Sequence, residues 1–249
     1  MSTNGSRAID RIAPTRRPDA ENAGTQRWRE LLFLHWTFPA EVVRPLVPEC
    51  FELDTWEDRA WVGLVPFAMR AIRSSWMPEK AGLDFLETNV RTYVLHDGVP
   101  GVYFFSLEAS SWLAVRVARL VWNLPYFHAT MESARKGDRI TYASSRRSEA
   151  EPRVKATWEL GEMLGPSREG TLEHFLLERY MLFSLTRAGG VRKGQVHHVP
   201  YPAQRATLAG EIDQTLIAAA GLPLDANTPP ETVHYAEGVD VEVFGPWDV

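Results

Sequence analysis

The sequence has few of the residues and motifs that disulfides, metal sites or cofactor sites require. Cys50 is the only cysteine among 249 residues, which excludes an intramolecular disulfide and a thiolate metal cluster. The chain has no H-E-x-x-H motif, and the adjacent His197 and His198 would point to opposite faces of a strand. It also lacks the G-x-S-x-G, Walker and dinucleotide-binding motifs. We therefore expect no metal and no cofactor.

Excess positive charge and long apolar runs are missing too. The formal net charge is −5, and no basic stripe with interleaved aromatic residues occurs, so we expect no nucleic-acid partner. The N-terminus has no apolar signal core, and no long uncharged apolar span follows. We therefore expect a soluble cytoplasmic protein with no membrane partner.

The length and composition predict one domain. A hydrophobic content of 45% is sufficient for a substantial core. Residues 1–26 are rich in polar residues without periodicity, which predicts a disordered or draped tail. Residues 27–249 contain no internal repeat and no linker, so we predict a single domain there. The sequence leaves open whether the chain forms a homo-oligomer.

The most informative pattern lies in residues 85–128, where two predicted strands flank a turn and a helix follows. Asp97-Gly98 and Pro100-Gly101 supply the backbone angles of a tight antiparallel hairpin. The second strand, residues 102–108, is largely apolar on both faces, which predicts a buried central strand. Ser110 or Ser111 is a predicted N-cap for a helix over residues 112–122.

The first strand of this hairpin carries a polar stripe. Alternate side chains of a strand share a face, which groups Glu87, Asn89, Arg91 and Tyr93. The opposite face carries Thr88, Val90, Thr92 and Val94. Two interpretations compete: a solvated outer face, or the lumen of a barrel in which Glu87 and Arg91 pair across Asn89 and offer hydrogen bonds to a ligand.

The remaining elements are predicted from apolar periodicity, caps and breakers. Strands are predicted at residues 28–36, 126–134, 139–145, 154–160, 178–185 and 191–200, with a last strand pair or bent strand from Thr232. Residues 51–55 and 60–69 are predicted to form a hairpin around Glu57-Asp58. Helices are predicted after Pro39, after Thr171 and over residues 207–220. The loop at residues 76–83 is a candidate lid.

Several sequence blocks resemble those of the YqjF-like family, a group known as uncharacterised. The blocks are E-T-N-V-R-T-Y-V from Glu87, G-V-Y-F-F-S-L-E-A from Gly101, A-R-L-V-W-N-L-P-Y-F-H-A from Ala118, L-F-L-H-W-T-F-P from Leu32, L-V-P-E-C-F-E-L-D-T-W from Leu46, W-V-G-L-V-P-F from Trp61 and L-E-R-Y from Leu177. That family is similar to the acetoacetate decarboxylase-like superfamily. The resemblance implies an α+β, mainly antiparallel β fold: an acetoacetate decarboxylase-like β-barrel with a ligand cavity and a few peripheral helices.

The decarboxylase motif itself is incomplete. Its pattern R-E-x-W-G-[FY]-P-K-K contains a lysine that forms a Schiff base and a neighbour that lowers the pKa of that lysine. Arg119, Trp122 and Pro125 match this pattern, but Tyr126 and Phe127 stand at the two lysine positions. Neither side chain can form an imine. The resemblance therefore implies the fold and a pocket, and it argues against Schiff-base decarboxylation.

The candidate site consists of polar residues that would be costly to bury without partners. Glu87, which resembles a cavity glutamate of the decarboxylases, and His128 are the candidate acid/base residues. The candidate substrate-binding residues are Asn89, Arg91, Arg119, Tyr126, Arg179 and Tyr180. We expect a small carboxylate- or carbonyl-containing molecule in the lumen, with an arginine holding the carboxylate and any catalysis proceeding by acid/base chemistry.

Three alternatives stay open. The polar residues can form a structural ion-pair network. The protein can be a non-catalytic ligand-binding or interaction protein, whose pocket is packed by side chains such as Phe127 or serves as a sensor. A retained decarboxylase would need one of Lys80, Lys136, Lys155 or Lys193, all outside the motif.

Overall fold

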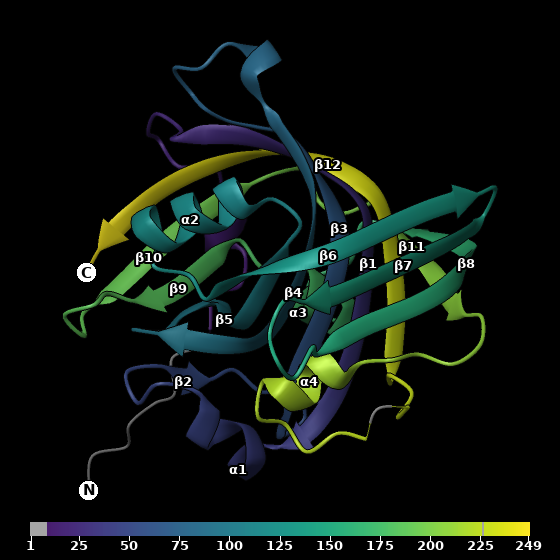
Figure 1. Cartoon of the computed structure of the whole chain (residues 1–249). Coiled ribbons are helices and arrows are strands. Elements are labelled where there is room, and N and C mark those ends of the chain that lie inside the picture. Colours follow the sequence, from purple (N-terminus) through teal and green to yellow (C-terminus); the bar gives the residue numbers. More distant parts are fainter. Residues whose placement is uncertain (1–8, 226) are drawn as a thin grey trace, which may run out of the picture.

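The computed structural model describes residues 9–225 and 227–249 (Figure 1). Its strands are β1 (Gly24–Pro39), β2 (Glu52–Leu53), β3 (Arg59–Ser74), β4 (Leu83–His96), β5 (Val99–Ala109), β6 (Tyr126–Lys136), β7 (Arg139–Arg146), β8 (Arg153–Gly165), β9 (Met181–Leu185), β10 (Val191–His197), β11 (Ala203–Leu208) and β12 (Thr232–Asp248). The helices are α1 (Ala40–Val43), α2 (Trp112–Val121), α3 (Leu172–Leu177) and α4 (Thr215–Ala219), with 3-10 turns η1 (Ala13–Thr15), η2 (Arg44–Leu46) and η3 (Glu79–Ala81).

The twelve strands form one sheet that closes on itself twice. β12, β1, β3, β4 and β5 are neighbours in that order. A first ring is closed from β5 through β9 and β10 back to β12, and a second through β6, β7, β8 and β11 back to β12. Most pairs are antiparallel, and β5 is parallel to both β6 and β9. The predicted fold, α+β and mainly antiparallel with few helices, is confirmed.

The shared strands separate two cores because their side chains alternate. Leu32 and Leu34 of β1 lie in one apolar cluster, whereas Leu31 and Phe33 lie in the other. The same alternation places Val90 of β4 in the first cluster. The cluster that contains Leu31 and Phe33 surrounds the interior of the first ring, where the site lies.

One end of the first ring is closed by α3, a short helix whose residues 174–177 are buried. Thr171 is its N-cap and accepts a hydrogen bond from the backbone N–H of His174, as the sequence predicts. At the other end α2 crosses from β5 toward β9. Ser111 caps α2, and Ser184 Oγ of β9 donates a hydrogen bond of 3.0 Å to the carbonyl of Trp122.

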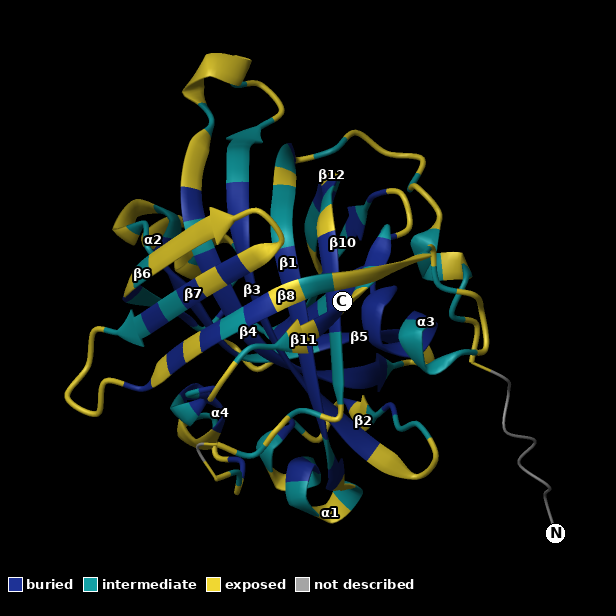
Figure 2. Cartoon of the chain, turned by 90° about the vertical axis from the view of Figure 1, so that its right-hand side faces the viewer, coloured by how far each residue is buried: buried dark blue, intermediate teal, exposed yellow. Residues whose placement is uncertain are grey.

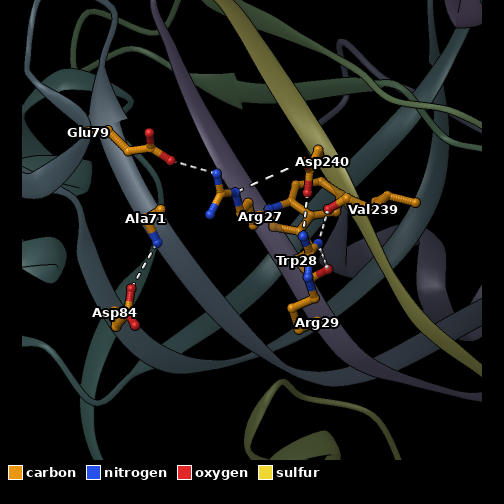
Figure 3. Close-up of polar contacts among 8 residues, drawn as sticks. All are labelled: Arg27, Trp28, Arg29, Ala71, Glu79, Asp84, Val239 and Asp240. Atoms are coloured by element: carbon orange, nitrogen blue, oxygen red, sulfur yellow. Dashed lines mark hydrogen bonds and ion pairs between the residues drawn. The ribbon is translucent and has the colours of Figure 1, made fainter.

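The β3–β4 hairpin projects beyond the rest of the molecule, with η3 at its exposed tip (Figures 1 and 2). Figure 3 shows polar contacts at this arm and beside it: Arg27 of β1 lies 2.6 Å from Glu79, and Asp84 accepts a 2.8 Å hydrogen bond from the N–H of Ala71. The Arg27–Glu79 pair is exposed and therefore weak. This arm coincides with the predicted candidate lid.

Most predicted elements are present, including the β4–β5 hairpin with Asp97 and Gly98 in left-handed conformations. Two predictions were correct only in part. The predicted hairpin is reduced to a tight turn at Glu57-Asp58, where Trp56 and Arg59 form an isolated bridge, and β2 pairs with β4 instead of β3. The predicted helix at residues 207–220 begins instead with the end of strand β11, and only Thr215–Ala219 is helical.

The described part of the N-terminal segment lies against the sheet. Residues 1–8 lie outside the described residues. Gly24 already begins β1, and before it Gln195 of β10 donates a 2.8 Å hydrogen bond to the carbonyl of Pro14. Arg17 forms an ion pair of 2.7 Å with Glu242 of β12, so this segment is draped along the sheet. Among the described residues, no helix has both the length and the apolar character needed to span a membrane.

Candidate ligand-binding site

The first ring encloses a cavity of about 440 Å³. Its wall consists of side chains from β1, β3, β4, β5, β9, β10 and β12, the first residue of β6, and the inner face of α2. This volume lies in the range of pockets that hold drug-sized ligands. The lumen is therefore open. Phe127, predicted as a possible filler, does not line the cavity and instead stacks under Arg146, with the guanidinium carbon 3.9 Å from its ring centre.

The polar stripe of β4 faces this cavity. Glu87, Asn89 and Arg91 all line it and are only 2%, 5% and 8% exposed. Their strand neighbours Val90 and Val94 lie in the opposite apolar cluster, as the alternation predicts. The lumen interpretation of the stripe is thus the one that the structure supports, and the solvated-face interpretation was wrong.

Glu87 is held by a tyrosine and not by the predicted arginine. The hydroxyl of Tyr126 donates a 2.7 Å hydrogen bond to Glu87 Oε2, and within the described residues Glu87 forms no ion pair. Burial raises the pKa of Glu87 to about 8; the hydrogen bond from Tyr126 opposes this rise, and the nearby Glu108 adds to it. At neutral pH the carboxyl group is therefore mostly protonated.

Arg91 is a buried cation without an acidic partner in the described part of the chain. One Nη2–H donates to the carbonyl of Leu176 in α3 at 3.3 Å, and the guanidinium lies over the ring of Phe33 at 5.7 Å. Arg91 Nε and the neighbouring Asn89 Oδ1 are buried without any hydrogen-bond partner. A buried polar atom left unsatisfied costs about 1–3 kcal/mol, so this end of the cavity is incomplete without a ligand.

A second arginine enlarges the positive charge at this end. Arg179 lines the cavity and pairs with the buried Asp54 at 2.7 Å, and its Nη2 has no partner. Asp54 also pairs with Arg11 of the N-terminal segment, so one carboxylate serves two guanidinium groups. Together with Arg91 this group carries a net positive charge. The adjacent His35 is buried, and burial followed by Arg91 holds its pKa well below the ordinary value, so it adds no charge.

Six of the eight predicted site residues line the cavity: Glu87, Asn89, Arg91, Tyr126, Arg179 and Tyr180. Arg119 and His128 do not. Arg119 is on the exposed side of α2, where its Nε donates a 2.6 Å hydrogen bond to the carbonyl of Tyr126. His128 is the last residue of β6 that pairs with β5, opposite Ala109, and β6 continues from Ala129 as a partner of β7. These two residues therefore have no direct access to a ligand in the cavity.

The sequence did not reveal the apolar part of the wall. Side chains from strands far apart in sequence meet there, among them Val65, Phe67, Val196, Tyr201 and Val243. No lysine lines the cavity within the described residues. The described residues also contain no group of three or more His, Cys, Asp or Glu side chains arranged to hold a metal ion.

Comparison with other proteins identifies similar sequences. Residues 25–240 match the family model DUF2071, described as an uncharacterized conserved protein. The chain is 36% identical over 225 residues to the uncharacterized protein YqjF of Bacillus subtilis (strain 168), which covers 90% of this chain and 91% of the relative. The predicted YqjF-like resemblance is confirmed.

Solved structures show the same fold at low identity. The enduracididine biosynthesis enzyme MppR, complexed with the condensation product of pyruvate and imidazole 4-carboxaldehyde, superposes with a TM-score of 0.61 and 12% identity over 92% of this chain and 90% of that chain. Acetoacetate decarboxylase from Legionella pneumophila has a TM-score of 0.57 and 15% identity over 100% and 98% of the two chains. The predicted acetoacetate decarboxylase-like fold is confirmed.

Proposed function

The chain belongs to the DUF2071 family of uncharacterized conserved proteins, and from the geometry of its cavity we propose that it binds a small organic acid there. The carboxylate lies against Arg91, and a carbonyl or second polar group of the ligand lies beside Glu87. One observation carries the proposal: a guanidinium only 8% exposed lines an open cavity, has an unsatisfied Nε, and has no carboxylate partner in the described residues.

An anionic ligand suits the electrostatics of this end. The charges of Arg91 and Arg179 outweigh that of Asp54, and protonated Glu87 adds no negative charge at neutral pH. A guanidinium binds a carboxylate through two parallel hydrogen bonds, and the low dielectric of a buried site strengthens them. The carboxylate of the ligand supplies the negative charge and the hydrogen-bond acceptors that Arg91 lacks among the described residues.

The same site favours acid/base chemistry without an imine. The cavity wall has no lysine in the described residues, and Tyr126 stands at the first lysine position of the decarboxylase motif. A carboxyl group with a pKa of about 8 is close to the optimum for proton transfer near neutral pH. In the fraction of molecules in which Glu87 is ionised, its carboxylate can take a proton from the carbon next to a ligand carbonyl and return it, which is an enolisation and needs no oxidant.

The structural neighbours fit this proposal at the level of the fold. One solved structure of MppR contains pyruvate, a keto acid, and another neighbour is an acetoacetate decarboxylase. Pyruvate and acetoacetate are both carbonyl-containing acids. These likenesses support the choice of a carboxylate ligand and leave its identity to experiment.

The first test is a thermal-shift screen of small carboxylic and keto acids on wild type and Arg91→Ala. A ligand at 100 times its Kd stabilises the folded state by about 2.7 kcal/mol, which raises the apparent Tm. We expect a shift in wild type that is absent in Arg91→Ala and retained in Arg116→Ala, a control on the outer side of α2. If Arg91→Ala and Glu87→Gln lower stability but leave ligand binding unchanged, the polar stripe is structural and the proposal fails.

A second candidate function is non-catalytic binding or sensing in the same open cavity. The two are separated by following hydrogen–deuterium exchange at the carbon next to the carbonyl of a bound keto acid by NMR. We expect wild-type protein to accelerate this exchange and Glu87→Gln to bind without accelerating it. Binding with no acceleration by wild type favours the non-catalytic function.

A further inference from the structure

The cavity is longer and more apolar than a small keto acid requires. Its charged and amide groups on β4 occupy only one end, at Glu87, Asn89 and Arg91. Beyond Glu87 the wall is formed mainly by large apolar side chains from β1, β3 and β4: Trp28, Met69, Ile72 and Phe85. Apolar wall that contacts only water does not stabilise the protein. An apolar group of a ligand would remove this surface from water, which favours binding.

Positions along β4 give the length of this apolar section. Leu83 and Glu87 are separated by four residues, which corresponds to roughly 13 Å at about 3.3 Å per residue. Leu83 and Arg91 are twice as far apart, roughly 26 Å. An extended chain advances about 1.2 Å per bond, as a polypeptide does, so the path from Arg91 to Leu83 corresponds to roughly twenty bonds, about ten of them beyond Glu87.

The open end of the cavity has an apolar rim. Leu83 at the base of the β3–β4 arm and Leu113 and Val117 of α2 line the cavity, yet they are 38%, 44% and 50% exposed. Trp112 and Leu120 extend this exposed apolar surface along α2. An apolar rim continuous with an apolar cavity wall fits a ligand that enters or ends with an apolar group.

We propose that the ligand is an extended monocarboxylic acid of roughly sixteen to twenty carbons, of which about the last ten form an apolar tail beyond Glu87. Its carboxylate lies at Arg91, and its tail passes Phe85 to the rim at Leu83, Leu113 and Val117. This inference rests on the proposed function, because it uses Arg91 as the group that binds the carboxylate.

The reverse orientation has one candidate group. Arg73 lines the cavity at the end of β3 near the rim and could hold a carboxylate there. That orientation would leave the buried Arg91 Nε and Asn89 Oδ1 unsatisfied and would place an apolar tail end against them. The positive charge at the closed end therefore favours the carboxylate at Arg91.

Isothermal titration calorimetry with a chain-length series tests the inference on the full chain. The probes are butyrate, hexanoate, octanoate, decanoate, dodecanoate, tetradecanoate and hexadecanoate below their micelle concentrations, with decanol as the uncharged control for decanoate. Each buried CH₂ contributes about 0.8 kcal/mol, so we expect the affinity to rise about fourfold per added carbon and then level off. Decanol is expected to bind much more weakly than decanoate.

Two pairs of variants locate the tail and the carboxylate. Ala118 lines the cavity from α2, so Ala118→Phe shortens the apolar section, and we expect it to weaken hexadecanoate at least tenfold and butyrate little. Arg116→Phe, on the outer side of the same helix, is the matched control. Arg91→Gln is expected to weaken decanoate at least tenfold, and Arg73→Gln is expected to have a smaller effect.

The outcomes separate this inference from the proposed function. If short acids bind through Arg91 with no gain from a longer chain, the tail inference is wrong and the proposed function stands. If Arg73→Gln abolishes decanoate binding and Arg91→Gln does not, the proposed orientation is wrong. If no acid binds to wild type, the proposed function itself fails. The wild-type series decides the first and third outcomes even where a variant does not fold.

Discussion

The hydroxyl of Tyr126 donates a hydrogen bond of 2.7 Å to Oε2 of Glu87 inside the cavity. Tyr126 is the residue that stands at the first lysine position of the decarboxylase motif, and Phe127, at the second, points away to Arg146. An uncharged donor thus contacts the buried carboxyl group. A lysine there would favour the ionised carboxylate, whereas tyrosine allows Glu87 to stay protonated near pH 7.

Replacing Tyr126 by phenylalanine tests this relationship. The hydrogen bond from Tyr126 lowers the pKa of Glu87, so Tyr126→Phe is expected to raise that pKa further above 8. The measurement is a ¹³C NMR titration of protein labelled at glutamate, with the Glu87 signal assigned by its loss in Glu87→Gln. Tyr180→Phe, which removes a 2.7 Å hydrogen bond to Glu178, is the control and leaves the Glu87 titration unchanged. An unchanged or lowered Glu87 midpoint in Tyr126→Phe contradicts the assignment.

Glu87 should also make stability depend on pH. Its pKa is about 8 in the folded protein against an ordinary value of 4.5, so between these values the folded protein holds a proton that the unfolded chain has released. The free energy of unfolding contributed by Glu87 is therefore greatest below pH 4.5 and falls as pH rises to about 8, by up to about 1.4 kcal/mol per unit.

Glu87→Gln does not titrate and should remove this slope. We expect urea unfolding from pH 5 to pH 9 to show the variant gaining stability relative to wild type as pH rises, with no further gain above pH 8. Glu132→Gln, at an exposed position of β6, is the matched control and should follow wild type. Parallel curves for wild type and Glu87→Gln would show that Glu87 is ionised throughout this range.

Local sequence signals predicted much of the fold. Two-residue alternation assigned Glu87, Asn89 and Arg91 to one face, Asp97-Gly98 predicted the β4–β5 turn, and Thr171 predicted the start of α3. Ring closure could not be predicted in this way, because the β10–β12 and β5–β9 pairs join segments distant in the chain and leave no periodic signal. The end of β11, Thr207 and Leu208, was included in a predicted helix because apolar residues at helical spacing follow it in α4.

The sequence predicted the site residues that alternate along one strand. It did not predict those whose position depends on how distant strands and helices pack together. Arg119 and His128 were selected for their closeness in sequence to the decarboxylase motif. Arg119 falls on the solvent side of α2, and His128 does not line the cavity although β6 still pairs with β5 there, opposite Ala109. Tyr126, between them, faces the cavity, where its hydroxyl contacts Glu87. Whether a face is wet or enclosed depends on ring closure, which the stripe itself does not encode.

The cavity wall predicts a negative result when borohydride is used to reduce and so trap an imine. With no lysine lining the cavity in the described residues, acetoacetate and borohydride should give no reduced adduct, under conditions that label an imine-forming decarboxylase. Intact-protein mass spectrometry makes the measurement, and the imine-forming enzyme treated in parallel is the control. A reduced adduct that peptide mapping places on Lys80, Lys136, Lys155 or Lys193 would restore the Schiff-base alternative.

The buried pair of Asp54 and Arg179 should be far more important for stability than any exposed pair. Their side chains are almost inaccessible, their N–O distance is 2.7 Å, and Asp54 also contacts Arg11. Asp54→Asn leaves Arg179 charged and buried without a counter-ion, so we expect a loss of about 3–5 kcal/mol in the free energy of unfolding, measured by urea denaturation. Glu79→Gln breaks the exposed pair with Arg27 and should cost less than about 1 kcal/mol.

A double variant distinguishes the lost ion pair from a general packing defect at Asp54. Arg179→Met removes the stranded charge and keeps an apolar stem, so adding it to Asp54→Asn should restore part of the lost stability. The effects of the two single substitutions will then be strongly non-additive. Additive losses of stability would mean that the charge of Arg179 is not balanced by Asp54. The 2.7 Å contact between them would then contribute little to holding Arg179 at the positive end of the cavity.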